Sequence, residues 1–592
     1  MSSEMSRCRS QPAHTTHVGT LALLMASAAI TAPATAQAPP ARPNIVLIIA
    51  DDWGYSDPGA HGSEIATPTI DALARAGTRF ANFHVAASCS PTRAMLLTGV
   101  NAHRAGLGNM PETIPPEHQG KPGYNAVLAP GVTTLAQRLR RSGYATLYAG
   151  KWHLGHAAGD LPTARGWDRA LALTQSGADN WENKPNKLLY ERADWTRDGK
   201  TARMPRRFYS STLIVDEAIA QIDSVKGKPF FATLGFLANH IPVQASDADI
   251  AAYRSRYLAG WSALRTARAA GVVQAGVLPP SPRVTMDSTR DWATLPAAEK
   301  ARWARAMAVY GGMATAMDRE IGRLIAHLKT TGQYENTMFV FVSDNGSEAT
   351  NPEASRFTTA MTRLWYDMAP ERQGQPGTLT YIGASWASAA ASPLSGYKFS
   401  ASEGGVRVPF IVSLPPAERQ ARGGVVAAPA HAVDLAPTLL DMAGIADRTG
   451  LEGLSLLPAL ADPAARIHPA DEAIGYELSG NTVLYQGDHK LVKNLPPYGD
   501  GRWHLYDIMA DPGETRDLTA ADPARFVTMQ AQWQRWADAN QVLPMPAGYS
   551  APAQIQANAL HDLLPGRLAP MVASLWLLLL GVWTGRRWRK MR

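Results

Sequence analysis

Short apolar runs and helical patterns alternate through most of the chain. Apolar runs bounded by turn-forming residues occur at Ile45–Ala50, Ala145–Ala149, Phe230–Phe236, Thr337–Val342 and Pro409–Ser413. The spacing of amphipathic helices occurs between them, at Thr69–Ala76, Thr133–Arg141, Ser211–Val225 and Ala297–Leu328. Because continuously apolar strands are buried on both faces, this pattern predicts an α/β fold with a large mixed, mainly parallel sheet sandwiched by helices. In such sheets the functional groups gather at the carboxyl ends of the strands.

The pattern changes after about residue 446, where turn-forming residues become frequent. Strand-like stretches follow around Asn481–Gln486 and Lys490–Lys493, and the run Trp503–Asp507 precedes Asp511-Pro512-Gly513-Glu514. We therefore predict a main domain over residues 37–445, a smaller C-terminal α+β subdomain over residues 446–550 and a linker over residues 551–567.

The first residues have the pattern of a secretory signal. An apolar run at 19–32 follows Arg7 and Arg9, and the small-residue site Ala34-Thr35-Ala36 comes next. We predict a signal peptide over residues 1–36 and export to the bacterial periplasm or the cell surface. A buried N-terminal helix is the alternative, which the short run and the proline-rich residues after it disfavour.

The last residues also have the pattern of a targeting segment. Residues 568–585 are mostly apolar, and the basic tail at 586–592 follows them. This order predicts either a C-terminal membrane anchor or a sorting segment that is removed after export. A buried helix is the alternative, although residues 575–583 show no polar face.

Charge excludes a polyanion-binding body. The chain has 592 residues, 45% of them hydrophobic, and a net charge of +7. Residues 1–36 contribute +1 and residues 567–592 contribute +6, which leaves the body between them neutral. We therefore expect a globular protein with no nucleic-acid partner.

Two pairs of oxygen-bearing side chains follow apolar runs and predict a cation site. Asp51 and Asp52 follow the first run, and Asp344 and Asn345 follow the run that ends near Val342. Turns after strands are the ordinary alternative, but the same arrangement occurs twice. Adjacent buried carboxylates repel each other unless a cation lies between them. Three carboxylates and an amide suit Ca²⁺, Mg²⁺ or Mn²⁺ rather than zinc.

The cysteines lead to a third motif. Only Cys8 and Cys89 are present, and removal of the signal peptide would leave Cys89 as a lone thiol. Cys89 precedes a predicted helix with Ser90 as its N-cap and an end near Gly99. Arg93 lies one turn further on, so the helix start and a guanidinium could face one anion. A plain buried cysteine is the alternative.

At this point the residues carry a family resemblance. The run Cys-Ser-Pro-Thr-Arg at 89–93, with Thr-Gly at 98–99, resembles the signature of the sulfatase family. Gly-Lys-Trp-His-Leu-Gly at 150–155 resembles a second family signature. The resemblance spans roughly residues 43–540 and is closest to bacterial arylsulfatases. It implies an alkaline-phosphatase-like fold and a cysteine that a formylglycine-generating enzyme converts to formylglycine (3-oxoalanine), whose hydrate is the nucleophile.

The resemblance also implies the site. The metal ligands would be Asp51, Asp52, Cys89, Asp344 and Asn345, with Ca²⁺ expected and Mg²⁺ or Mn²⁺ as alternatives. The catalytic residues would be Cys89, Arg93, Lys151, His153, His240 and Lys398. Lys151 and His153 are two residues apart, so on a continuing strand they would share one face. Lys398 is supported by the resemblance alone.

These residues imply hydrolysis of a small-molecule sulfate monoester to an alcohol or phenol and inorganic sulfate. Asp344 is a candidate base for the attack, His240 or Lys398 would serve the leaving group, and His153 would act in sulfate release. A phosphonate monoester or phosphodiester hydrolase of the same superfamily is the alternative. A binding protein that keeps an inactive sulfatase fold is a third reading. Scattered aromatic residues line a pocket for an aromatic or sugar alcohol, or else belong to packing or to surface loops: Trp181, Tyr190, Trp195, Trp365, Tyr366 and Trp386.

Overall fold

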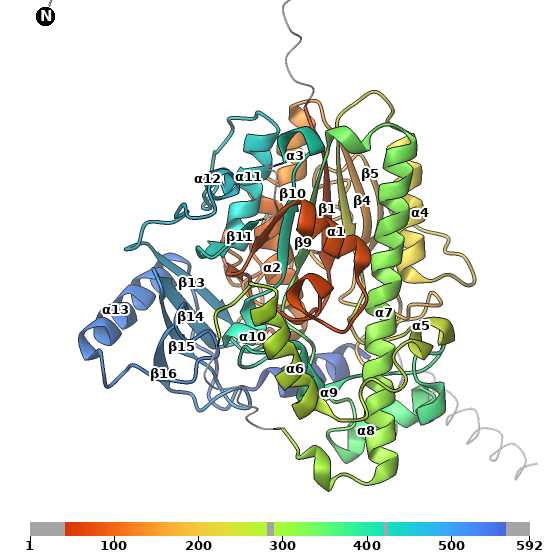
Figure 1. Cartoon of the computed structure of the whole chain (residues 1–592), viewed down its shortest axis with the longest axis vertical. Helices are drawn as coiled ribbons and strands as arrows, with labels where there is room; N and C mark the ends of the chain where they lie inside the picture. Colours follow the sequence, from red (N-terminus) through yellow and green to blue (C-terminus); the bar gives the residue numbers. More distant parts are fainter. Residues whose placement is uncertain (1–41, 281–288, 420–423, 564–592) are drawn as a thin grey trace, which may run out of the picture. The chain divides into compact units, whose positions relative to one another are not determined.

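Ten strands of the described chain form one central sheet (Figure 1). The computed structural model describes residues 42–280, 289–419 and 424–563. In spatial order the strands are β11 (Gly424–Val426), β2 (Thr78–Phe80), β10 (Phe410–Ser413), β9 (Thr337–Ser343), β1 (Asn44–Ala50), β8 (Phe230–Gly235), β4 (Ala145–Lys151), β5 (Arg169–Leu173), β6 (Trp195–Arg197) and β7 (Lys200–Thr201). A two-stranded sheet pairs β12 (Ala430–His431) with β3 (Phe83–His84).

The centre of the large sheet is parallel and its two edges are mixed. β9, β1, β8, β4 and β5 pair in parallel. β10 runs antiparallel to both β9 and β2, and β6 runs antiparallel to β5 and β7. The prediction of a large, mixed and mainly parallel sheet is therefore confirmed.

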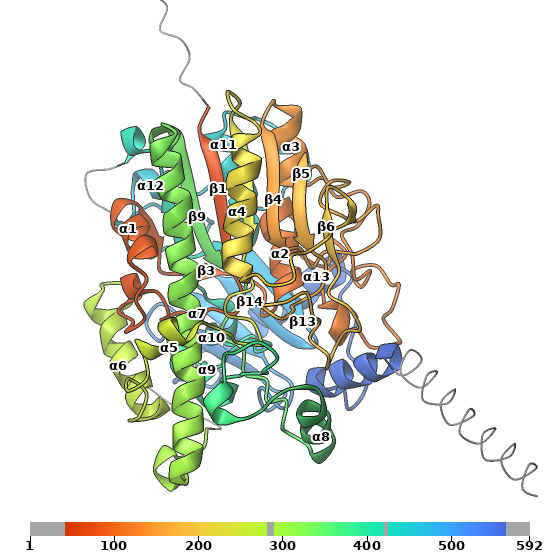
Figure 2. The ribbon, with the colours of Figure 1, turned by 90° about the vertical axis from the view of Figure 1, so that its right-hand side faces the viewer.

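Helices cover both faces of this sheet (Figures 1 and 2). Alternate residues of the fully buried strand β1 point into two different apolar clusters, because side chains alternate along a strand. Ile45, Leu47 and Ile49 pack with α2, α3 and α11, whereas Val46 and Ile48 pack with α1, α4 and α7. The helices are α1 (Pro68–Ala76), α2 (Cys89–Thr98), α3 (Leu135–Arg141), α4 (Ser210–Asp223), α5 (Asp247–Ala251), α6 (Trp261–Gln274), α7 (Ala297–Thr330), α8 (Arg356–Trp365), α9 (Gly383–Ala390), α10 (Glu403–Val406), α11 (Leu435–Met442), α12 (Leu457–Ala461) and α13 (Pro523–Ala539).

The start of α2 differs from the prediction. The N-cap is Ser88, in an extended conformation, and not Ser90. The carbonyl of Ser88 accepts a hydrogen bond from the amide of Thr92 (3.3 Å), so the helix begins two residues earlier than predicted. The helix ends as expected at Gly99, whose φ of 70° is left-handed. This shift places Cys89 inside the first turn of α2.

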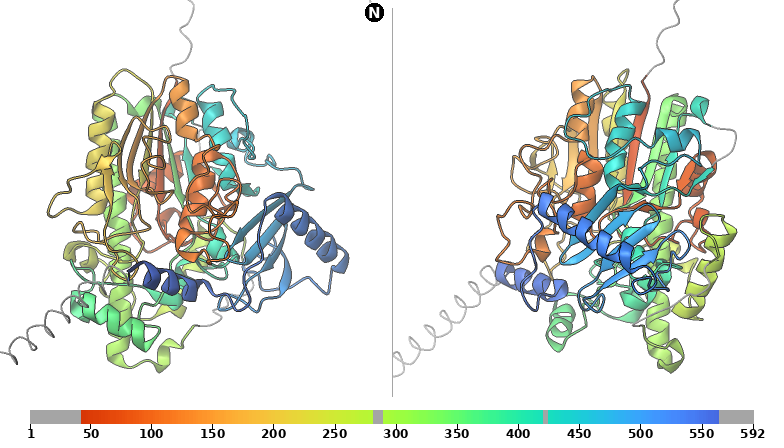
Figure 3. Two further views of the ribbon diagram at one scale, coloured as in Figure 1. Left: turned by 180° about the vertical axis from the view of Figure 1, so that it is seen from behind. Right: turned by 90° about the vertical axis from the view of Figure 1, so that its left-hand side faces the viewer.

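A smaller antiparallel sheet follows the central sheet in the chain (Figure 3). It contains β13 (Ala473–Leu478), β14 (Asn481–Gln486), β15 (His489–Lys493) and β16 (Trp503–Asp507), in that order. One of its faces packs on α13, through Leu484, Leu491 and Met529. Tyr485 and Val492 on its other face belong to the apolar cluster that contains α2 and α11. The predicted C-terminal α+β subdomain is confirmed as an element of the fold.

Several predicted segments lie at the ends of the chain. The signal peptide at 1–36, the apolar segment at 568–585 and the basic tail at 586–592 lie outside the described residues. Within the described part, no helix has both the length and the apolar character needed to span a membrane. Residues 551–563, predicted as part of a linker, are helical.

Candidate active site

The strand ends bring the predicted site residues to one edge of the central sheet. β1 and β9 lie side by side with Ala50 paired to Ser343. The pair of oxygen-bearing side chains after each strand therefore leaves the sheet at the same level. The amide of Asp344 donates to the carbonyl of Ala50 (3.1 Å), and the amide of Asp52 donates to Asp344 Oδ1 (3.4 Å). β4 ends nearby at Lys151. The carboxyl ends of parallel strands thus form the site, as the fold class predicts.

Four of the predicted metal ligands form a compact buried group. Atoms of Asp51, Asp52, Cys89 and Asp344 that can bind a metal all lie within 4.8 Å of one another. The side-chain amide nitrogen of Asn345 donates to Asp52 Oδ1 (2.7 Å). Asp52 Oδ2 and Asn345 Oδ1 are buried and have no hydrogen-bond partner among the described residues. Buried acceptors of this kind normally have a partner, so these two oxygens fit a cation.

Two cations contact this group from the side of β4 and α2. Lys151 Nζ lies 2.6 Å from Asp51 Oδ2, and both side chains are fully buried. Arg93 Nε donates to Asp344 Oδ2 (2.8 Å), and Arg93 Nη1 donates to the carbonyl of Lys151 (2.8 Å). Arg93 Nη2 is buried and lacks a partner within the described part of the chain. The guanidinium therefore keeps a donor free for an oxyanion.

A third cation, Lys398, contacts the carboxylate of Asp52. Lys398 Nζ lies 2.7 Å from Asp52 Oδ1 and 2.9 Å from Glu348 Oε2. Glu348 was not predicted as a site residue. Its only signal in the sequence is its position four residues after Asp344. The structure thus adds a fourth carboxylate beside the three aspartates.

Burial and the neighbouring charges shift the pKa values of the three aspartates in different directions. It raises the pKa of Asp52 to about 8 although Lys398 opposes this, and it raises the pKa of Asp51. Burial acts on Asp344 in the same sense, but Arg93 and the lysines outweigh it and keep the pKa of Asp344 below its usual value. A divalent cation among these oxygens would favour the ionised form of all three. The donor set therefore fits a hard cation.

The thiol of Cys89 is held in a form that is a poor nucleophile. Cys89 is fully buried in the first turn of α2, and its Sγ donates to Asp51 Oδ1 (3.4 Å). Burial, followed by the charge of Asp344, holds the pKa of the thiol well above its usual range. Only the thiolate attacks efficiently. In the absence of a cation, the neutral thiol is therefore favoured at this position.

His153 does not continue the strand that ends at Lys151. Its φ of 57° is left-handed, so the predicted shared strand face is wrong. Its Nε2 instead lies 3.3 Å from Glu112 Oε1. Burial lowers the pKa of His153 despite the neighbouring carboxylate, which favours the neutral ring. Glu112 was not predicted, and nothing in its local sequence marks it.

His240 reaches the site from the turn after β8. Its Nε2 lies 3.9 Å from Asp52 Oδ2 and 3.3 Å from Ser176 Oγ, and its Nδ1 lies 2.7 Å from the carbonyl of Ile241. Burial, with the charges of the two site lysines, lowers the pKa of His240 well below its usual value. His240 thus lies beside Asp52, whereas His153 contacts Glu112.

The scattered aromatic residues have different roles in packing. Trp195 and Trp386 are buried in the apolar cluster with α4 and α7. Tyr366 belongs to a smaller buried cluster that includes Ile241, next to His240. Tyr190 contacts the site, because its hydroxyl donates to Glu112 Oε1. Three of the six rings, Trp195, Tyr366 and Trp386, are therefore core residues.

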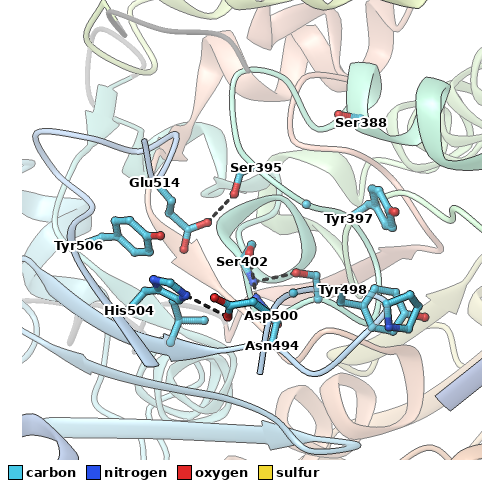
Figure 4. Close-up of a pocket in the computed structure, with 15 residues that line it drawn as sticks. Ser388, Ser395, Tyr397, Ser402, Asn494, Tyr498, Asp500, His504, Tyr506 and Glu514 are labelled. Atoms are coloured by element: carbon cyan, nitrogen blue, oxygen red, sulfur yellow. Dashed lines mark hydrogen bonds and ion pairs between the residues drawn. The ribbon is translucent and has the colours of Figure 1, made fainter. Parts of the chain in front are cut away.

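A polar pocket of about 260 Å³ lies where the residues between α9 and α10 meet the C-terminal sheet (Figure 4). Its lining includes Ser395, Tyr397, Ser402, Asp500 and Glu514. None of the catalytic or metal residues predicted within the described chain lines it. The pocket and the acidic group are therefore built from different residues.

Comparison with known proteins identifies the class. The family model described as Sulfatase matches residues 43–445, and the chain belongs to the sulfatase family. It is thus a sulfuric ester hydrolase by class, and its sheet and helices are those of the alkaline-phosphatase-like fold.

Similar proteins cover most of the chain. An arylsulfatase of Klebsiella aerogenes is 34% identical over 441 residues, which are 72% of this chain and 92% of that protein. An uncharacterized sulfatase of Schizosaccharomyces pombe is 34% identical over 513 residues, covering 82% of this chain and 92% of that protein. The crystal structure of Ps i-CgsB matches with a TM-score of 0.60 and 26% identity, covering 84% of this chain and 93% of that one.

Proposed function

We propose that the protein is an arylsulfatase that hydrolyses sulfate monoesters to a phenol or alcohol and inorganic sulfate, with formylglycine at position 89 and a bound divalent cation. The observation that carries the proposal is the packing of Cys89 against three buried carboxylates at the start of α2. The similarity to the arylsulfatase of Klebsiella aerogenes supports the substrate class.

The residues present fit a divalent cation. Asp51, Asp52, Asp344 and Asn345 would hold it through oxygen atoms, which suits Ca²⁺ and also permits Mg²⁺ or Mn²⁺. The unpartnered oxygens of Asp52 and Asn345 support this assignment. When bound, the cation would supply positive charge to the oxygens of the sulfate group.

The balance of charge also suits an anionic ester. Four carboxylates, including Glu348, lie beside three cations: Arg93, Lys151 and Lys398. With all four ionised, one negative charge is in excess. A divalent cation turns this excess into one positive charge, which matches the single charge of a sulfate monoester. Binding the ester then leaves the buried site close to neutral.

The position of Cys89 in the first turn of α2, next to three carboxylates, supports its replacement by formylglycine. The hydrated aldehyde would supply a hydroxyl nucleophile that is not easily oxidised. Arg93 offers its free Nη2, and the first turn of α2 offers backbone N–H groups to the sulfate oxygens. Asp344 is positioned by Arg93 and is the candidate base for the attack.

His240 and Lys398 are the candidates for the leaving group. Both contact Asp52, from 3.9 Å and 2.7 Å respectively. Lys398 is charged, since Asp52 and Glu348 outweigh burial and hold its pKa well above the usual value. Lys398 would therefore stabilise the charge of a departing phenolate or donate a proton to it. Neutral His240 carries its hydrogen on Nδ1, which donates to the carbonyl of Ile241, so its Nε2 would serve the leaving group only after taking up a proton. His153 is the candidate base for sulfate release.

The remaining assignments belong to the same proposal. We propose export to the periplasm or cell surface, maturation by a formylglycine-generating enzyme, and membrane attachment or sorting through residues 568–585. We also propose domain limits at 37–445 and 446–550, with residues 551–567 connecting the body to the C-terminal segment.

The test uses full-length protein that is coexpressed with a formylglycine-generating enzyme. We expect turnover of 4-nitrophenyl sulfate to exceed that of bis(4-nitrophenyl) phosphate and of a phosphonate monoester in kcat/KM. The Cys89→Ala variant should be inactive, and peptide mass analysis should show the mass of formylglycine at position 89. Active protein with an intact, alkylatable Cys89 would contradict the mechanism, and a higher kcat/KM for the phosphodiester would favour the alternative hydrolase.

A further inference from the structure

A glutamate outside the known motifs contacts one of the site histidines. We infer that Glu112 is a positioning residue: its carboxylate accepts the Nε2 proton of His153 and leaves Nδ1 as the basic nitrogen that faces the reaction. This inference deepens the proposed function and rests on it for the role of His153. It assigns a function to Glu112 and to its partner Tyr190, which the sequence motifs do not include.

The tautomer follows from the contact. Glu112 lies in a short 3-10 turn (Pro111–Thr113), and its Oε1 is 3.3 Å from His153 Nε2. An ionised carboxylate only accepts hydrogen bonds, so Nε2 must carry the hydrogen. A neutral imidazole then has its lone pair on Nδ1. His153 Nδ1 is buried and has no hydrogen-bond partner among residues 42–280, 289–419 and 424–563.

Glu112 is itself held at both ends. The Tyr190 hydroxyl donates to Oε1 of its side chain. The Asn558 amide, from the helix at 551–563, donates to the carbonyls of Glu112 (3.0 Å) and Ile114 (3.1 Å). A carboxylate that is fixed in this way can orient an imidazole ring, as partners of ligating and catalytic histidines do.

The charges agree with this arrangement. Burial acts to raise the pKa of Glu112, but His153 and Tyr190 outweigh it and bring that pKa to about 2. Burial lowers the pKa of His153, and Lys151 and Arg93 act in the same direction, whereas Glu112 opposes them. The pair is therefore a neutral imidazole beside an ionised carboxylate. When Nδ1 takes a proton, the carboxylate stabilises the imidazolium and keeps its own charge.

The backbone supports a fixed ring. His153 has a φ of 57°, in the left-handed region that non-glycine residues seldom adopt. Such a conformation persists only where the surrounding structure holds it. The side chain of His153 therefore points away from the strand direction of Lys151 and towards Glu112.

The test compares Glu112→Gln with Glu117→Gln, which removes the same charge from an exposed glutamate five residues away. Both are measured as matured full-length protein with 4-nitrophenyl sulfate over a range of pH. For Glu112→Gln we expect kcat to fall by about 10²–10³-fold without a rise in KM. The acidic limb of kcat should move to lower pH, because the imidazolium loses its counter-charge. A Glu112→Gln variant with the kcat and acidic limb of Glu117→Gln would overturn the inference.

A second variant separates positioning from simple support of the turn. Asn558→Ala removes the two backbone contacts of this segment and keeps the carboxylate. We expect it to lower Tm slightly and to leave the acidic limb of kcat in place. If Asn558→Ala reproduces both the kcat loss and the pH shift of Glu112→Gln, Glu112 is a structural residue and the inference fails.

The tautomer can also be measured without turnover. In protein with ¹⁵N-labelled histidine, the His153 signals are assigned by their loss in His153→Gln. We expect the Nε2–H tautomer in the wild type and a shift towards Nδ1–H in Glu112→Gln. An Nδ1–H tautomer in the wild type would overturn the inference. Wild-type protein that hydrolyses no sulfate ester but shows the Nε2–H tautomer would refute the proposed function and leave the positioning of His153 supported.

Discussion

Two buried charge clusters in this protein differ in how completely their groups are partnered. The first, here the acidic site, contains Asp51, Asp52, Arg93, Lys151, Asp344 and Lys398. The second, here the subdomain cluster, joins the C-terminal sheet to α10 and to the two-stranded sheet, and contains His84, Glu403, Arg407, Lys490 and Glu514. Glu514 of this second cluster also lines the polar pocket (Figure 4).

Both oxygens of Glu403 have partners in the subdomain cluster. Lys490 Nζ (2.8 Å) and the Tyr485 hydroxyl (3.1 Å) contact Oε1, while His84 Nε2 (3.0 Å) and Arg407 Nη1 (3.3 Å) contact Oε2. These contacts outweigh burial and hold the pKa of Glu403 well below its usual value. Within the described chain, the carboxylate is thus saturated by protein groups.

In the described part of the subdomain cluster, His84 Nδ1 also lacks a hydrogen-bond partner, whereas Glu514 Oε1 meets Lys490 Nζ at 2.8 Å. The acidic site is different because its unused atoms are two oxygen acceptors and a guanidinium donor. Asp52 Oδ2, Asn345 Oδ1 and Arg93 Nη2 lack hydrogen-bond partners among the described residues. Burial and charge pairing alone therefore do not distinguish a reaction centre from a structural junction. The difference lies in acceptors and donors that remain for a cation and an oxyanion.

The largest expected effect is on stability, in the subdomain cluster. Lys490→Met leaves Glu403 and Glu514 without their shared cation, and losing one partner of a buried pair costs about 3–5 kcal/mol. We expect this loss in the free energy of unfolding in urea, with kcat per folded molecule within about threefold of wild type. The exposed Lys226→Met is the matched control. Loss of kcat without loss of stability would refute the structural role of this cluster.

The corresponding change in the acidic site should act on catalysis. Lys151→Met removes a cation from the sulfate-binding region, and loss of one stabilising group costs about 10²–10³-fold in kcat, or about 3–4 kcal/mol. We expect this loss for 4-nitrophenyl sulfate, measured against Lys226→Met. Unchanged kcat together with a stability loss equal to that of Lys490→Met would show that Lys151, like Lys490, acts on stability and not on catalysis.

A histidine at the edge of the subdomain cluster predicts pH-dependent stability. Burial opposes charge on His468, but Asp434 and Glu472 outweigh it and raise the pKa of His468 to about 9. Its contribution of about 3 kcal/mol is therefore complete below pH about 6.5 and is lost as the pH rises through about 9. His468→Gln should destabilise the protein at pH 6 and have little effect at pH 9.5 in urea unfolding. The exposed His561→Gln serves as control, and a pH-independent difference would contradict this linkage.

The smallest effect on stability in this series concerns the cation of the acidic site. Removal of the ion with EDTA should abolish turnover and lower Tm, because a ligand at 100 times its Kd stabilises the folded protein by about 2.7 kcal/mol. Adding Ca²⁺ should restore both, and parallel titrations with Mg²⁺ and Mn²⁺ identify the preferred ion. The Asp52→Asn variant should show a much smaller response of Tm to added ion. Turnover that survives chelation would argue against the cation.

The sequence predicted the fold well because its signals are local. Strand β1 has apolar side chains on both faces, so it appears as an unbroken apolar run. The two pairs of oxygen-bearing side chains, Asp51-Asp52 and Asp344-Asn345, were found because each follows such a run. Errors arose where one residue changes the geometry: the cap of α2 lies at Ser88, and the left-handed φ of His153 ends the strand pattern.

The sequence alone determined the residue chemistry of this protein: the family motifs, the oxygen-rich pairs, the lone cysteine and the order of strands and helices. Only the tertiary structure decided which of these groups meet, because hydrogen bonds of buried side chains join segments far apart in the chain. Asn345 reaches Asp52 across 293 positions, and His153 reaches Glu112 across 41. No local pattern encodes such a partner, since packing of the whole sheet and its loops sets the distance between them.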